Sequence, residues 1–175
     1  MKKIFILPLY VALLAISADG VAEDRYFGDW SWDYIDGGAL ALTASDTGKG
    51  LGQFCDFGDG MCIYKVMFPV TCEYGGSYPI LVSTDGAAFT MNMTCLKSND
   101  DGGVYGLTPF DDIDRIIREG NRIGLVMAME GGAFSVVRFS LRGSNAAMDD
   151  MIKNFVVARR ARGVPERRVS GDQVL

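Results

Sequence analysis

The 175-residue sequence contains no histidine. This absence excludes Ser-His-Asp and Cys-His catalytic groups and every metal site that uses histidine. Apolar residues make up 49% of the chain and aromatic residues 11%, so the chain is neither wholly disordered nor collagen-like. After residue 22, no apolar run approaches the roughly 18 residues of a membrane-spanning helix. The length predicts one domain. The lack of a long apolar run predicts that this domain does not span a membrane.

The first 22 residues have the pattern of a secretory signal peptide. Lys2 and Lys3 precede an apolar run over residues 4–16, and small residues stand at Gly20 and Ala22. The run is too short to cross about 30 Å of hydrocarbon. We therefore expect cleavage after Ala22 and a periplasmic or secreted protein. Residues 23–157 would form the domain, and residues 158–175 a basic tail that we expect to be solvated and mobile.

The predicted domain is acidic. Residues 23–157 carry 10 basic and 19 acidic groups, a net charge of −9. Such a surface repels nucleic acid and anionic lipid, so we expect no nucleic-acid partner. The tail concentrates positive charge in Arg159, Arg160, Arg162, Arg167 and Arg168.

Four cysteines follow the predicted signal peptide: Cys55, Cys62, Cys72 and Cys95. An even number in an oxidising compartment indicates disulfides, and four cysteines allow three pairings. We favour Cys55–Cys62, which would close a glycine-rich loop, and Cys72–Cys95, which would tie two strands. The spacings do not match the paired C-x2-C of a zinc ribbon.

Alternating apolar residues predict strands. The clearest are at 30–34, 62–68 and 87–96, with shorter candidates at 39–43 and 79–83. Residues 45–52 and 98–103 are rich in turn residues, and we predict loops there. Residues 123–129 and 133–141 flank Glu130-Gly131-Gly132 and predict a β-hairpin. The first strand of this hairpin is apolar on both faces, which predicts burial from both sides.

Two helices are predicted in the C-terminal half. Thr108 is a suitable N-cap, Pro109 fits the first helical position, and Gly120 fits a left-handed C-terminal residue. A second helix follows residues 143–145 and ends near Val157. The expected fold is a single β-rich α+β domain, with a mostly antiparallel sheet or sandwich.

The acidic residues suggest no clear catalytic or metal site. Three carboxylates at Asp111, Asp112 and Asp114 match the electrostatics of a helix N-terminus better than acid–base chemistry. Loop acids supply calcium-type oxygen atoms but lack EF-hand spacing; they are Asp56, Asp59, Asp100 and Asp101. Carboxylates from distant segments, as in glycosidases, are the remaining route to catalysis. We predict no enzyme activity, no cofactor and no metal.

Short motifs resemble the invasion-associated locus B family of secreted bacterial proteins. Phe27-Gly28-Asp29-Trp30 is similar to an opening F-G-D-W, and Ser140-Leu141-Arg142-Gly143 to a closing segment before the last helix. The first predicted helix and the residues Ala146-Ala147 add to the likeness, which spans about residues 25–157. The cysteines depart from the family pattern, so the resemblance implies no disulfide pairing. It implies a role in host interaction or virulence and supplies no catalytic residue.

These observations predict a non-enzymatic protein that binds another macromolecule in the envelope, the medium or the host surface. We expect its contacts on two loops, because loops on a rigid sheet often carry binding. The first holds Asp56, Phe57 and Asp59, and the second Asn99, Asp100 and Asp101. The alternative is a periplasmic inhibitor or immunity-type protein, whose acidic surface would block a basic enzyme or toxin.

Overall fold

The structure, a computed structural model, describes residues 25–164, so the predicted signal peptide and residues 165–175 of the predicted tail lie outside it. The elements are β1 (Tyr26–Phe27), β2 (Trp30–Ile35), β3 (Gly38–Ala44), β4 (Gly50–Asp56), β5 (Cys62–Phe68), β6 (Ser77–Thr84), β7 (Ala88–Asn99), β8 (Gly102–Thr108), α1 (Phe110–Glu119), β9 (Arg122–Ala128), η1 (Glu130–Gly132), β10 (Phe134–Ser140) and α2 (Ser144–Ala161). No described helix is long and apolar enough to cross a membrane.

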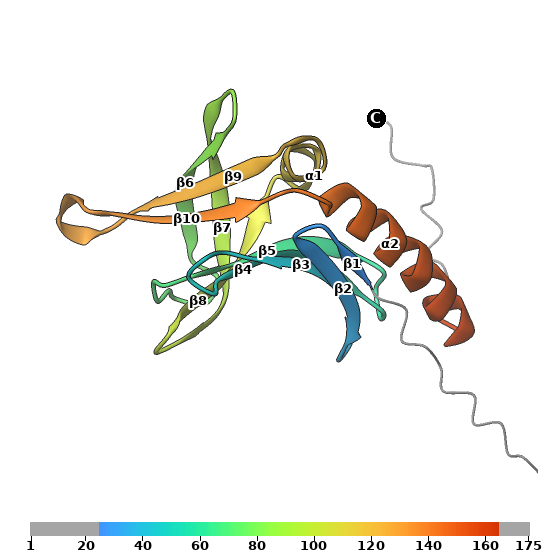
Figure 1. The fold of residues 1–175 in the computed structure, drawn as a ribbon. Coiled ribbons are helices and arrows are strands. Elements are labelled where there is room, and N and C mark those ends of the chain that lie inside the picture. The colour runs from blue at the N-terminus through green and yellow to red at the C-terminus, as the bar shows by residue number, and fades with distance from the viewer. Residues whose placement is uncertain (1–24, 165–175) are drawn as a thin grey trace, which may run out of the picture.

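The ten strands form one antiparallel sheet in the order β1-β2-β3-β4-β5-β8-β7-β6-β9-β10. The sheet is strongly curved, and the strands β6, β7, β9 and β10 lie across the layer formed by β2 to β5 (Figure 1). With α1 and α2 in the C-terminal half, this architecture confirms the predicted β-rich α+β class.

One face of the curved sheet and the two helices enclose the core. On β9, the side chains of Ile123, Leu125 and Met127 are buried, as period-two alternation requires. Helix α1 buries a stripe of three isoleucines, and α2 packs against β2 and β3. The indole N–H of Trp32 donates to Asp150 of α2 at 2.8 Å, which ties this helix to the sheet.

Both disulfides join the cysteines that the sequence analysis favours as pairs. Cys55 and Cys62 face each other across β4 and β5, with 4.0 Å between their Cα atoms. Cys72 joins Cys95 of β7 over a Cα separation of 6.0 Å. The prediction that Cys72 itself lies on a strand is wrong, because it lies in the segment between β5 and β6.

Several predicted boundaries are wrong. β4 begins inside the predicted 45–52 loop, and β8 was not predicted because its three glycines weaken the alternating pattern. α1 begins at Phe110 with Pro109 as its N-cap, so Pro109 is not the first helical residue; Thr108 is the last residue of β8 and not the N-cap. α2 continues to Ala161, so residues 158–161 of the predicted tail are helical.

Gly120 has an extended backbone with φ −82°, not the predicted left-handed conformation. A Cβ atom at this position would lie 2.9 Å from the side chain of Leu141 and 2.8 Å from the carbonyl oxygen of Ile116. A glycine stands here because the chain passes close to its neighbours.

Candidate functional site

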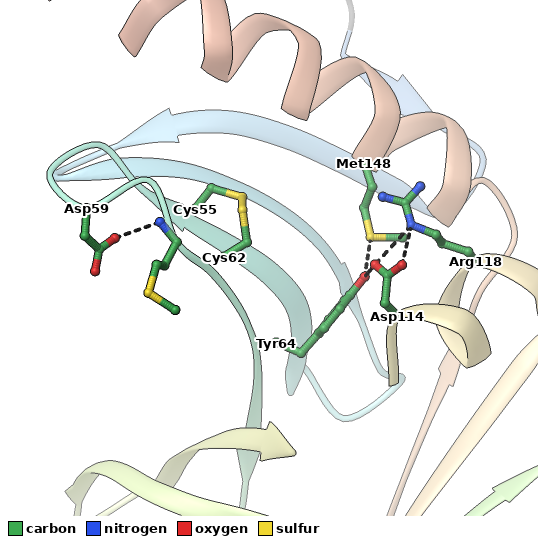
Figure 2. Close-up of a disulfide and its surroundings, with 8 residues drawn as sticks. Cys55, Asp59, Cys62, Tyr64, Asp114, Arg118 and Met148 are labelled. Atoms are coloured by element: carbon green, nitrogen blue, oxygen red, sulfur yellow. Dashed lines mark hydrogen bonds and ion pairs between the residues drawn. A yellow bond between two sulfur atoms is a disulfide. The ribbon is translucent and has the colours of Figure 1, made fainter. Parts of the chain in front are cut away.

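The first predicted binding loop is internally braced. The carboxylate of Asp56 accepts hydrogen bonds from the N–H groups of Gly58 and Asp59, and the carboxylate of Asp59 accepts one from Met61. Figure 2 shows the Asp59 contact beside the Cys55–Cys62 disulfide. The loop is therefore a rigid turn, as Asx-type hydrogen bonds favour.

Phe57 in this loop is a core residue, which corrects its prediction as an exposed contact. Its side chain is 5% exposed and stacks on Phe155 of α2 with ring centroids 5.1 Å apart. Arg159 donates to the carbonyl oxygen of Phe57 at 3.0 Å, and the Arg162 guanidinium lies 3.8 Å from the ring centroid. Two arginines assigned to the tail thus hold the loop against the end of α2.

The second predicted loop is the exposed turn between β7 and β8. Asn99 accepts a hydrogen bond from the N–H of Asp101, and Lys49 donates to the carbonyl oxygen of Asp101 at 3.3 Å. Asp100 is exposed at the tip. The two loops lie at opposite ends of β5, about 20 Å apart at the usual rise of a strand. The structure does not bring them into one surface.

A polar cluster joins the two helices to the sheet (Figure 2). The hydroxyl of Tyr64 donates to Asp114 at 2.6 Å, and the guanidinium of Arg118 binds the same carboxylate at 3.0 Å. Arg118 also reaches Asn145 and Asp149 of α2 at 2.8 and 2.7 Å. Asp114 therefore lies beyond the first turn of α1 and acts as a bridge, whereas Asp111 and Asp112 occupy the predicted N-terminal turn.

The cluster is electrostatically matched. Burial and the neighbouring Asp114 carboxylate raise the pKa of Tyr64 far above its usual range, so its hydroxyl remains a donor. Burial lowers the pKa of Arg118, but its hydrogen bonds to Asp149 and Asp114 outweigh this and raise it overall. These groups satisfy one another, and the arrangement fits a structural tie between α1, α2 and β5.

The two motifs behind the family resemblance contact each other. The carboxylate of Asp29 accepts hydrogen bonds from the Ser140 hydroxyl at 2.6 Å and from Arg142 at 2.7 Å. The backbone N–H of Asp29 donates to the carbonyl oxygen of Arg142, and the Trp30 indole donates to that of Ser140. We call this contact the clasp. It fastens the C-terminal end of β10 to the β1–β2 turn.

Two glycines make the clasp possible. Gly28 has φ +62° and Gly143 has φ +91°, both in the left-handed region. A Cβ atom on Gly28 would lie 2.7 Å from the carbonyl oxygen of Arg142, and one on Gly143 would collide with that of Phe27. The glycines are thus required by both conformation and space.

A third surface was not predicted. We define the outer face as the apolar side of β6, β9 and β10 that is turned away from the core; its residues are the exposed Pro79, Leu81, Ala128, Phe134 and Val136 and the half-buried Val126. The strand register places Leu81, Val126 and Val136 side by side in one row across three strands. On this side of β9, Gly124 is buried, Val126 is half-buried and Ala128 is exposed, so the predicted burial of the 123–129 strand on both faces is confirmed only in part.

A hollow of about 620 Å³ adjoins the outer face near the tip of the β9–β10 hairpin. Its lining comes from the segment 70–73, from Tyr78, and from Met127, Ala128 and Met129. Its volume is typical of a small-ligand site. Among the described residues, no three acidic or cysteine side chains group closely enough to hold a metal ion.

The sequence pattern indicates part of the outer face, namely the residues on β10. Phe134 and Val136 alternate with buried residues on β10, so exposure of one of the two sets was expected. Their adjacency to Leu81 depends on the order β6-β9-β10, which no local pattern reveals.

Comparisons with known proteins support the fold. No family model matches the chain, and no curated protein matches its sequence. The solved structures include a similar one, invasion associated protein B from Bartonella henselae. The TM-score is 0.57 at 14% identity, and the match covers 75% of this chain and 96% of the other. At this identity the likeness shows a shared fold, which agrees with the resemblance seen in the sequence.

Proposed function

We propose that this chain is a non-enzymatic bacterial protein of the periplasm or the exterior that acts by binding another protein. The outer face carries the proposal, because a contiguous exposed apolar surface on a small domain is typical of an interaction site. Leu81 on β6 is 42% exposed, and Val136 and Phe134 on β10 are 41% and 66% exposed, with β9 lying between the two strands.

The two disulfides fit an extracytoplasmic protein, and so does the structural neighbour. That neighbour is named for an association with invasion. We therefore propose a role in host interaction or in the bacterial envelope, in line with the signal peptide expected from the sequence.

The test compares two matched variants of residues 23–175 in the oxidised form. Leu81→Ser removes an apolar side chain from the outer face, whereas Ile35→Ser removes one of similar exposure, 44%, from the end of β2. Each immobilised protein is exposed to envelope extract, culture medium and host-surface extract. We expect one stoichiometric partner that the control retains and Leu81→Ser loses. Equal capture by both variants, or no partner for the unmodified protein, would refute the proposal.

The inhibitor function is a second candidate, favoured by the acidic tip of the β7–β8 turn. Asp100 and Asp101 are exposed there on a domain of net charge −9. A basic enzyme bound at this tip would dissociate at high salt, and Asp100→Asn with Asp101→Asn would weaken its binding. A partner lost with Leu81→Ser but insensitive to salt and to these variants would favour the first function.

A further inference from the structure

β10 is an edge strand with an open side. Ala133 and Leu141, which flank it, make backbone hydrogen bonds to Met129 and Asn121 on the β9 side. Odd-numbered residues therefore face β9, and even-numbered residues direct their N–H and C=O groups away from it. The clasp occupies the far end, where Ser140 accepts from Trp30.

The rest of this side is unpaired in the part of the chain that the structure describes. The outward backbone groups belong to Phe134, Val136 and Arg138, and all three residues are exposed. Figure 1 shows this end of the β9–β10 hairpin extending away from the rest of the sheet.

β10 has few of the features that commonly protect an edge strand, since Arg138 is its only charged residue. It contains no proline, lysine or acidic residue, and it keeps continuous register with β9 over seven residues. The opposite edge, β1, is only two residues long. β10 is therefore the edge best suited to pair with another strand.

We infer that the occupant is a second copy of this chain, paired antiparallel through β10 about a two-fold axis at Val136. The outward residues are symmetric about Val136, so Phe134 would face Arg138 of the other copy. Three such pairs give six backbone hydrogen bonds between the copies.

The side chains match in this register. Arg138, the only charged residue of β10, meets the ring of Phe134 instead of its own copy, and arginine binds aromatic faces favourably. Val136 meets Val136, so the two outer faces join into one apolar row. Parallel pairing would instead place Arg138 against Arg138. The inference uses the backbone of β10 and does not depend on the proposed function.

Sedimentation equilibrium of residues 23–175 tests the inference, and we expect a concentration-dependent dimer. Val136→Pro removes an N–H that points away from β9, so the fold tolerates it, while two central bonds of the dimer are lost. We expect the dimer to weaken about thirtyfold at ordinary hydrogen-bond strengths. A monomer at every concentration, or a dimer unaffected by this variant, would overturn the inference.

The register is tested by charge and by cross-linking. Phe134→Lys should weaken the dimer by repelling Arg138, Phe134→Glu should preserve it, and Val157→Lys is the control at similar exposure, 63%. Phe134→Cys and Arg138→Cys should form an intermolecular disulfide when mixed and none when separate, because paired Cα atoms lie about 5.5 Å apart. Equal effects of both charges, or cross-linking of either variant alone, would contradict this register.

Discussion

Replacing Gly143 with alanine should open the clasp. The left-handed backbone, φ +91°, disfavours any residue with a Cβ by about 1–2 kcal/mol. The added methyl group also meets the carbonyl oxygen of Phe27, and overpacking of this kind destabilises by about 1–3 kcal/mol. We expect a total loss of about 3 kcal/mol and a fall in Tm of about 9 °C for a domain of this size.

Gly48→Ala separates the two contributions. Gly48 has a similar φ of +73°, but nothing lies within 4 Å of the added Cβ atom. This control should lose only about 1 kcal/mol, from the backbone conformation alone. Urea unfolding followed by circular dichroism gives both free energies of unfolding. If Gly143→Ala costs no more than Gly48→Ala, the close approach of the two motifs does not stabilise the fold, and a stabilising role for the clasp is refuted.

Four further predictions test the interior and the crosslinks. Hydrogen bonds from Ser140 and Arg142 outweigh desolvation and lower the pKa of the Asp29 carboxyl below its ordinary 3.8. The stability that this carboxylate contributes is therefore present above pH 3.8 and is lost as the pH falls through the lowered pKa of the folded state. Asp29→Asn should remove this part of the acid sensitivity in urea unfolding measured at different pH values. Tyr64→Phe should cost about 1.5–3 kcal/mol in the same assay, because a charged carboxylate loses a donor. Gln53→Met should raise Tm by about 3 °C, since the buried Oε1 of Gln53 has no hydrogen-bond partner among residues 25–164. Replacing both cysteines of a disulfide by serine should lower the free energy of unfolding by about 2.5 kcal/mol for Cys55–Cys62 and about 3.5 kcal/mol for Cys72–Cys95. The second loss is larger because the sequence separation is 23 instead of 7. Equal losses would contradict an effect of loop length.

Local sequence signals predicted local structure well. The β9–β10 hairpin, the aromatic strand at Trp30 and both helices each depend on patterns within about twenty residues. The Cys55–Cys62 bond also closes a short loop. β4 and β8 were harder because glycines interrupt their alternation, and their strand geometry comes from pairing with neighbours.

The candidate surfaces depend on distant contacts, and there the prediction was weaker. Phe57 lies among the glycines and aspartates of a loop, which suggested an exposed position. It is buried because α2, about a hundred residues further along the chain, packs against it. The resemblance located the two halves of the clasp without indicating that they touch, since Trp30 and Ser140 are separated by 110 positions. The outer face required the order of strands, which is a property of the whole sheet.

The clasp and the open edge of β10 have one structural origin. Asp29 and Trp30, in the turn after the two-residue β1 and at the start of β2, bind Ser140, the last residue of β10, and Arg142 just beyond it. A longer β1 could continue along β10 and satisfy the backbone of Val136, which would close the sheet toward a barrel and leave no edge. The short β1 fixes one end of β10 and leaves the other exposed beside the outer face. A rigid strand with a free edge is suited to adding another strand, because little conformational entropy is lost on pairing.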